Sequence, residues 1–280
     1  MLSEKTKGIA ENYAARHEFG WVIFDKKPYG NYGLWEKPET TFDEARDALT
    51  EAVARAAGVK AGDRVLEVGC GYAASAVHYT KVFEPAAVVG LDVTEVRIEK
   101  GREYVAANGL ADRIQLEVGD ATALGFPSER FNRVIAIECA LHFDTRYDFF
   151  REAARVLLPG GGLGLADIVL RKGADRESFL THVHFPIGTG GSLDVPDNVY
   201  DASVYENLLR KCGFEDIRIE DVTDRTLAPL TDYLEQLGRE TEGERGPRRI
   251  AAAQIYREYI EHGLEYVFVS ARRSDDGAKA

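Results

Sequence analysis

Residues 65–75 read Val-Leu-Glu-Val-Gly-Cys-Gly-Tyr-Ala-Ala-Ser, and this stretch decides the fold. A short apolar run breaks at Gly69-x-Gly71 and then gives way to residues that favour a helix, so the pattern predicts a strand, a tight turn and a helix. Glycine at such a turn reaches backbone angles that other residues avoid, and it lets a ligand lie against bare backbone. The following helix directs free N–H groups at whatever lies over the turn. The stretch therefore predicts a ligand site at the end of a strand.

A second apolar run, residues 87–92, ends in the carboxylate of Asp92. An acid at the tip of the next strand is well placed to accept hydrogen bonds from a ribose. The two stretches together predict a ligand that contains a nucleoside and is held across two adjacent strand ends. Gly69-x-Gly71-x-x-Ala74 also fits the loose dinucleotide pattern, so an NAD-dependent oxidoreductase is an alternative from a different class of protein.

Three features favour a ligand other than a dinucleotide. Glu67 stands two residues before the first glycine, where a carboxylate would meet a positively charged end of a ligand rather than a pyrophosphate. The glycine motif also comes well inside the chain, behind an aromatic-rich leader, whereas dinucleotide-binding folds usually open with it. A third acid, Asp120, follows a strand predicted at residues 113–118.

Taken together, these motifs resemble those of the class I S-adenosylmethionine-dependent methyltransferases, and in particular the small-molecule methyltransferases that act on sugars and natural products. The resemblance covers residues 60–170 and implies S-adenosyl-L-methionine as cofactor, S-adenosyl-L-homocysteine as product and methyl transfer as the reaction. The motifs that carry it are Glu-Val-Gly-Cys-Gly-x-Ala (67–73), Gly-Leu-Asp (90–92), Gly-Asp-Ala (119–121), Phe-Asn-Arg-Val-Ile-Ala-Ile-Glu (131–138) and Leu-Pro-Gly-Gly (158–161).

The resemblance also implies a role for each cofactor-binding residue. Of these eight residues, two lie at the methionine part of the cofactor, two form the glycine turn beneath it, and four lie at or near the adenosine. At the methionine end, Glu67 contacts the amino group through water or backbone and Glu138 lies beside it, while Gly69 and Gly71 admit the backbone and ribose. At the adenosine, Asp92 takes both ribose hydroxyls and Val93 flanks the adenine. Asp120 accepts from the adenine amine, and Ala121 donates its N–H. The alternative role of Asp92 is to cap a helix predicted over residues 95–108.

His142 and Asp167 are the candidate catalytic residues. Methyl transfer from a sulfonium is an in-line displacement, so a protein accelerates it mainly by aligning the reactants, and a base helps when the acceptor is a hydroxyl. In the sugar and natural-product O-methyltransferases that this region resembles, a histidine after the fourth strand and an aspartate after the next strand act as base. A second histidine often precedes the first in those proteins, and here that position is Leu141. Purely structural roles for His142 and Asp167 stay open.

The acceptor side of the site is predicted from two other segments. Tyr29 and Tyr32 belong to an aromatic-rich leader, which either floors the ligand site, because aromatic faces stabilise a cation, or packs as a hydrophobic flap. His182, His184 and Phe185 lie in a glycine-containing segment that could contact the substrate as a lid. We expect no metal, because no nearby residue supplies a third ligand beside the two histidines.

The order of elements predicts the architecture. Strands alternate with helices up to residue 170, which indicates a doubly wound, mostly parallel, seven-stranded α/β sheet with ligands at the carboxyl ends of its strands. Two late strands predict an antiparallel hairpin at one edge. We divide the chain into an N-terminal flap (1–40), a methyltransferase domain (41–272) with lid segments 171–200 and 228–262, and a disordered tail (273–280).

Composition narrows the class of partner. The chain has 280 residues, 45% of them hydrophobic, and a net charge of −12, which argues against a nucleic-acid substrate because phosphate binding needs an excess of lysine and arginine. We find no apolar run of membrane-spanning length and no signal-peptide core, so a cytoplasmic location is expected. The acceptor is predicted to be a small natural-product-like molecule methylated on oxygen, with N- or C-methylation of an amine or apolar metabolite, or a non-catalytic ligand-binding role, as alternatives. A homodimer is possible.

Overall fold

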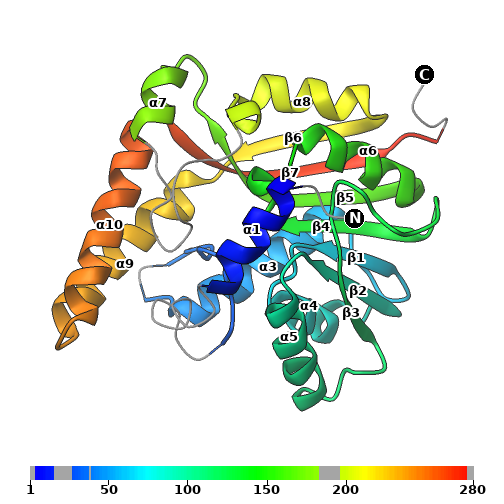
Figure 1. Cartoon of the computed structure of the whole chain (residues 1–280), viewed down its shortest axis with the longest axis horizontal. Helices are drawn as coiled ribbons and strands as arrows, with labels where there is room; N and C mark the ends of the chain where they lie inside the picture. The colour runs from blue at the N-terminus through cyan, green and yellow to red at the C-terminus, as the bar shows by residue number, and fades with distance from the viewer. Residues whose placement is uncertain (1–3, 16–26, 38, 183–195, 276–280) are drawn as a thin grey trace.

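A computed structural model describes residues 4–15, 27–37, 39–182 and 196–275 of the chain. Its centre is a seven-stranded sheet with strand order β3-β2-β1-β4-β5-β7-β6, in which the first five strands run parallel and β7 runs antiparallel to both of its neighbours (Figure 1). The predicted mostly parallel sheet and its antiparallel edge are confirmed. The strands are β1 (Arg64–Val68), β2 (Ala87–Asp92), β3 (Ile114–Val118), β4 (Phe131–Ile137), β5 (Leu157–Leu170), β6 (Phe214–Asp221) and β7 (Leu264–Arg273).

Helices cover both faces of the sheet, and each face has its own hydrophobic core. One core joins the sheet to α3 (Phe42–Ala57), α4 (Ala74–Phe83) and α5 (Glu95–Ala107). The other joins it to α6 (Arg146–Val156) and α8 (Ala202–Lys211). The central strands are buried on both sides, as expected of a sheet between two helical layers.

Local sequence explains why α3 lies so close to the sheet. Thr41 and Glu44 form a capping box at its start, and Gly58 ends it in a left-handed conformation with φ 73°. A Cβ atom at Gly164 of β5 would lie 2.6 Å from the Val53 carbonyl oxygen, so glycine there allows the helix backbone to rest on the strand.

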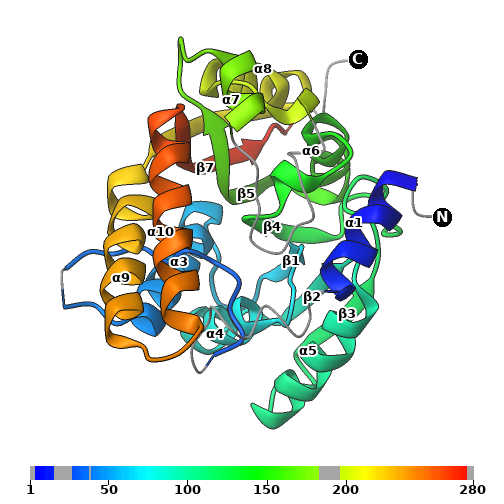
Figure 2. The same ribbon diagram turned by 60° about the vertical axis from the view of Figure 1, so that its left-hand side comes forward.

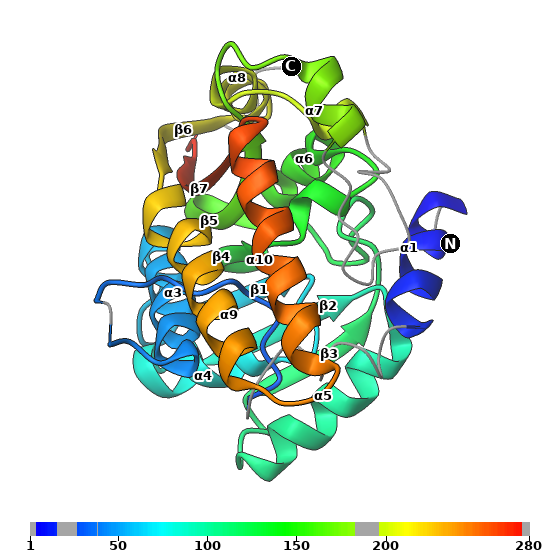
Figure 3. The same cartoon turned by 90° about the vertical axis from the view of Figure 1, so that its left-hand side faces the viewer.

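Three segments differ from the sequence prediction. The leader contains a helix, α1 (Glu4–Ala15), and the predicted loop after β5 contains α7 (Arg176–His182) and a 3₁₀ turn at Pro196–Asn198. The predicted lid segment 228–262 contains two helices, α9 (Leu227–Glu240) and α10 (Arg245–Glu261), which are separated by a turn with a left-handed glycine, Gly243. Figure 2 and Figure 3 show α9 and α10 side by side and α1 next to α5.

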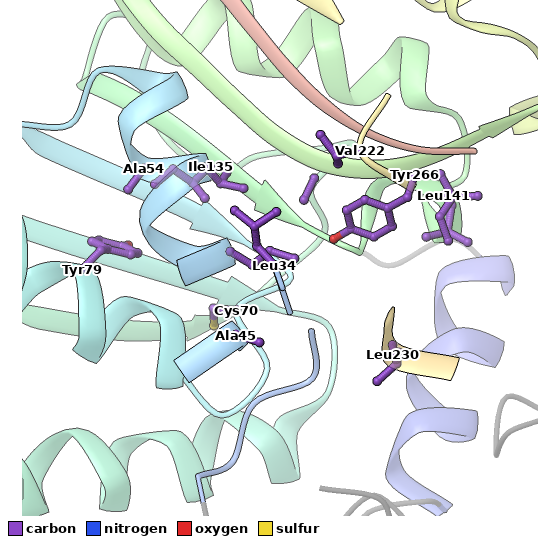
Figure 4. Close-up of a cluster of buried hydrophobic side chains, with 14 of the residues drawn as sticks. Leu34, Ala45, Ala54, Cys70, Tyr79, Ile135, Leu141, Val222, Leu230 and Tyr266 are labelled. Carbon is purple, nitrogen blue, oxygen red and sulfur yellow. The ribbon is translucent and has the colours of Figure 1, made fainter. Parts of the chain in front are cut away.

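The described part of the leader packs as a flap on the main domain. Trp35 stacks on Phe42 with ring centroids 5.6 Å apart and contacts Tyr233 of α9 at 5.0 Å. Leu34 lies in the same core, part of which Figure 4 shows with Ile135 of β4. The flap therefore ties α9 to the sheet. Within the described ranges, no helix combines the length and apolar character needed to cross a bilayer.

Candidate active site

The glycine turn after β1 has two glycines with different neighbours. Both have positive φ, 64° at Gly69 and 53° at Gly71. A Cβ atom at Gly69 would lie 2.5 Å from Cβ of Cys139, whereas one at Gly71 would meet no atom within 4 Å. Gly69 is thus required by a protein contact, and Gly71 leaves bare backbone facing open space, which suits a bound ligand.

Asp92 closes one side of this turn. Its carboxylate is buried and accepts hydrogen bonds from the backbone N–H groups of Gly71, at 2.9 Å, and Thr94, at 2.9 Å. Thr94, not Asp92, occupies the N-cap of α5, so the structure does not support the helix-cap alternative. Val93, half-buried, follows directly. The acid is therefore anchored to the glycine turn at the tip of β2, as the sequence predicted for a ribose contact.

Asp120 lies beyond the end of β3 and links the sheet to the N-terminal helix. Its Oδ2 accepts from the Thr6 hydroxyl of α1 at 3.0 Å, while Oδ1 accepts from the N–H and hydroxyl of Thr122 at 2.8 and 2.7 Å. Ala121 is buried beside it. The Thr6 contact was not predicted, since nothing in the sequence of α1 indicates which strand end it covers.

Glu67 is almost completely buried in β1, with 1% of its surface exposed. The Ser75 hydroxyl of α4 donates to its Oε1. Burial raises the pKa of Glu67 to about 7, against the opposing effect of that hydrogen bond. The carboxyl group therefore lies under the glycine turn and is close to its titration point at neutral pH.

Glu138, directly after β4, holds the flap. Its Oε1 accepts hydrogen bonds from the Tyr32 N–H at 2.8 Å and from the Tyr266 hydroxyl at 2.6 Å. Burial raises the pKa of Glu138 to about 8, and its φ of 53° is in the left-handed region that non-glycine residues seldom adopt. The sequence assigned Glu138 to the methionine end of the cofactor; the structure adds a carboxyl group that joins the flap to β7.

His142 lies on a 3₁₀ turn, Ala140–His142, that packs against the glycine turn. The Cys139 thiol donates to the Val68 carbonyl at 3.3 Å, and its side chain fills the space beside Gly69. The His142 N–H donates to the Cys139 carbonyl at 3.0 Å. The predicted base is therefore carried by a short turn fixed directly to the predicted cofactor site.

Asp167 does not fit the predicted role of base. The residue has no exposed surface, and its carboxylate is paired with the guanidinium of Arg146, Nε at 2.8 Å from Oδ2 and Nη2 at 3.0 Å from Oδ1. The Tyr205 hydroxyl and the Ile168 N–H donate to it as well. Burial, the largest single effect, would lower the pKa of Arg146, but the Asp167 carboxylate together with Tyr200 and Tyr205 outweighs it, so the pKa is raised. An inaccessible carboxylate so paired anchors structure rather than taking a proton from a substrate.

The remaining predicted acceptor residues have four different outcomes. Tyr32 lies in an aromatic cluster, with its ring 5.3 Å from that of Tyr256 and 6.0 Å from that of Tyr266. Tyr29 has a structural role, because it is buried and donates to Asp47 of α3 at 2.5 Å; burial first, and then the Asp47 contact, raises its pKa. His182 ends α7 and stacks on another histidine, His262, at 4.3 Å. His184 and Phe185 lie outside the described residues.

Comparisons with known proteins identify the family of this chain. The profile of a methyltransferase domain matches residues 65–161. Erythromycin 3''-O-methyltransferase of Saccharopolyspora erythraea is 32% identical over 258 residues, which cover 88% of this chain and 83% of that protein. The chain belongs to the class I S-adenosylmethionine-dependent methyltransferases. It is therefore an enzyme of methyl transfer with S-adenosyl-L-methionine as cofactor, and the oxidoreductase alternative is rejected.

Two further comparisons extend the likeness. The 27-O-demethylrifamycin SV methyltransferase of Amycolatopsis mediterranei is 31% identical over 88% of this chain and 90% of that protein. Geranyl diphosphate C-methyltransferase of Streptomyces coelicolor, crystallised with Mg²⁺, geranyl diphosphate and S-adenosyl-L-homocysteine, superposes with a TM-score of 0.74 over 97% of this methyltransferase and 99% of that chain, at 16% identity. At that identity the second likeness concerns the fold alone.

The residues present fit the cofactor of this family. Bare backbone at Gly71 faces open space, and the Asp92 carboxylate is fixed beside it. Buried Glu67 adds a second acid beneath the same turn. Opposite charge near the sulfonium and amino groups and hydrogen-bond acceptors near the ribose are what this cofactor requires of a protein.

Proposed function

We propose that this methyltransferase transfers a methyl group to a hydroxyl oxygen of a natural-product-like small molecule, with His142 as the general base. The observation that carries the proposal is the fixed contact between the His142 turn and the glycine turn, through Cys139 and Gly69. Within residues 60–170, His142 is the histidine that follows the end of a strand. The contact holds its turn beside the predicted cofactor site. Imidazole suits this role because it accepts a proton near neutral pH.

Cofactor binding is proposed to use the strand ends around the glycine turn. When bound, S-adenosyl-L-methionine supplies the methyl group on a sulfonium leaving group. Asp92 would bind the ribose, with Val93 beside the adenine, and Asp120 and Ala121 would bind the adenine edge under the cover of α1. The Glu67 carboxyl and the Gly69–Gly71 turn would face the methionine part, and Glu138 would orient that end of the site through Tyr32.

The acceptor is proposed to lie against the partly exposed rings of Tyr32 and Tyr256, which pack with the fully buried ring of Tyr266. These rings come from the flap, α10 and β7, so they join three segments that are far apart in the sequence. Aromatic faces suit a large apolar or ring-containing acceptor. The names of the two methyltransferases reported above, for the 3''-O position of erythromycin and for 27-O-demethylrifamycin SV, support oxygen over the alternatives of nitrogen and carbon.

His142 is proposed to take the proton of the acceptor hydroxyl as the new oxygen–carbon bond forms. The other contribution of the protein is alignment, which supplies most of the acceleration for a displacement with a good leaving group. His182, His184 and Phe185 stay proposed lid contacts. The cytoplasmic location and the homodimer stay predictions.

The test uses purified protein, methyl-labelled S-adenosyl-L-methionine and a panel of hydroxylated macrolide glycosides and macrolactones, with primary amines as a comparison set. We expect label in an O-methyl product, identified by mass spectrometry and carbon NMR, and loss of this product in His142→Ala. Label found only on nitrogen or carbon would contradict the proposed acceptor atom, and label transferred to oxygen at the same rate by His142→Ala would contradict the proposed base.

A further inference from the structure

Asn198 is the last residue of the 3₁₀ turn Pro196–Asn198, and it is buried, with 3% of its surface exposed. Its side-chain oxygen accepts from the backbone N–H of Arg146 at 3.0 Å. Its side-chain nitrogen donates to two carbonyl oxygens, that of Leu141 at 3.2 Å and that of Phe143 at 3.0 Å. Because a carbonyl cannot donate and an N–H cannot accept, this pattern fixes the orientation of the amide.

The two carbonyls are those on either side of His142. One NH₂ group therefore holds the backbone before and after the proposed base, while the His142 N–H is held by the Cys139 carbonyl at 3.0 Å. An alanine or a carboxylate at position 198 could not make these contacts.

Asn198 is in turn held by the buried ion pair. The Arg146 guanidinium donates through Nη1 to the Asn198 carbonyl and through Nη2 to the Ile168 carbonyl at 2.6 Å. Asp167 pairs with the same guanidinium at 2.8 and 3.0 Å. Charge-assisted, bidentate bonds of this kind define geometry more tightly than single neutral ones. The end of β5, the start of α6 and the 196–198 turn thus form one fixed frame.

We infer that Asn198 is a positioning residue that sets the place of His142 relative to the glycine turn, with the Arg146–Asp167 pair as its anchor. The inference rests on the proposed function for the part that His142 plays. It also explains how a short turn can hold the proposed base in place. The turn is fixed through Cys139 on the cofactor side and by Asn198 on the other side. An error of about 1 Å in such a group can cost on the order of 100-fold in rate.

The test compares Asn198→Asp with Asn198→Ala. The aspartate keeps an oxygen that can accept from the Arg146 N–H, and the bond from the guanidinium to the backbone carbonyl of residue 198 does not depend on the side chain, so the fold should persist. It replaces the NH₂ donor with an oxygen that repels both carbonyls. Asn132→Ala is the matched control, because Asn132 also accepts from a backbone N–H, that of Arg64, but at the opposite end of β4.

Each protein is labelled with ¹⁵N-histidine and saturated with S-adenosyl-L-homocysteine, and the His142 ring signals are assigned by their loss in His142→Gln. We expect these signals to shift or broaden in both Asn198 variants, while those of His78 and His262 and the affinity for S-adenosyl-L-homocysteine stay at the wild-type values. With a hydroxyl acceptor, kcat should fall by about 100-fold in both variants. Asn132→Ala should change none of these.

Unchanged His142 signals in folded Asn198→Asp would overturn the inference, as would a general shift of all histidine signals with loss of S-adenosyl-L-homocysteine binding. The proposed function fails separately, if the wild-type protein methylates no hydroxyl. In that case the ring signals alone decide whether Asn198 positions His142.

Discussion

Replacing Asp167 with asparagine separates a structural acid from a catalytic one. Asp167 is fully buried and pairs through both oxygens with Arg146, which is 1% exposed. Asparagine keeps the shape but leaves the buried guanidinium without its counter-charge. Removing one partner of such a pair costs about 3–5 kcal/mol of unfolding free energy. For a chain of this size, with a shift of about 2 °C per kcal/mol, the expected fall in Tm is about 6–10 °C.

Urea unfolding followed by circular dichroism measures this cost, and two controls make it specific. Glu206→Gln removes an exposed ion pair to Arg210 on α8, and we expect a change of at most about 0.5 kcal/mol. The double variant Arg146→Met/Asp167→Leu removes both charges, so it should recover much of the stability that Asp167→Asn loses. Suppose that the unfolding free energy of Asp167→Asn lies within about 1 kcal/mol of wild type while turnover is lost. This result would refute the structural role and restore Asp167 as a base.

Three other variants test the site. Asp92→Ala removes the acceptor of the Gly71 N–H and the proposed ribose contact, and calorimetry should show about 10- to 100-fold weaker binding of S-adenosyl-L-homocysteine; unchanged affinity would contradict the ribose assignment. His142→Ala should lower kcat and leave that affinity unchanged, and equal losses in both would indicate a structural role. The pKa of Glu138 is raised to about 8, so the folded protein keeps a proton that the unfolded chain has lost, and the unfolding free energy should fall as pH rises from about 5 to 8. In Glu138→Gln this fall should be smaller. A pH profile of urea unfolding that is the same in Glu138→Gln and wild type would contradict the buried carboxyl.

The sequence was sufficient to predict the sheet and the strand ends because both follow from local patterns. Buried parallel strands are continuous apolar runs, and the capping box at Thr41 and the left-handed Gly58 mark a helix by local chemistry alone. Asp92 and Asp120 are at strand tips, so their place follows once the strands are known. The break between α9 and α10 could not be predicted with the same certainty, since a single Gly243 within a helical pattern gives only a weak signal for a break.

The roles of Asp167, Gly69 and Asn198 could not be predicted, because each depends on a partner far away in the chain. Asp167 meets an arginine 21 residues earlier, and Asn198 meets the carbonyls beside His142 more than 50 residues away. Arg146 could have been suspected as a partner for a strand-end acid, but its burial arises from packing between α6, α8 and β5. A glycine at position 69 fits the motif whether a ligand or another part of the protein requires it. Only the position of Cys139 shows that a protein contact does.

The account depends on one statement, that Asp92 at the end of β2 and Asp120 after β3, beside the glycine turn that follows β1, bind the adenosine of the cofactor. A crystal structure of the protein with S-adenosyl-L-homocysteine tests it most directly. We expect the ribose hydroxyls at the Asp92 carboxylate, the adenine at Asp120 and the sulfur on the side of the His142 turn. Density for the ligand at any other place, or none beside Gly71 in a crystal grown with saturating ligand, would contradict the account.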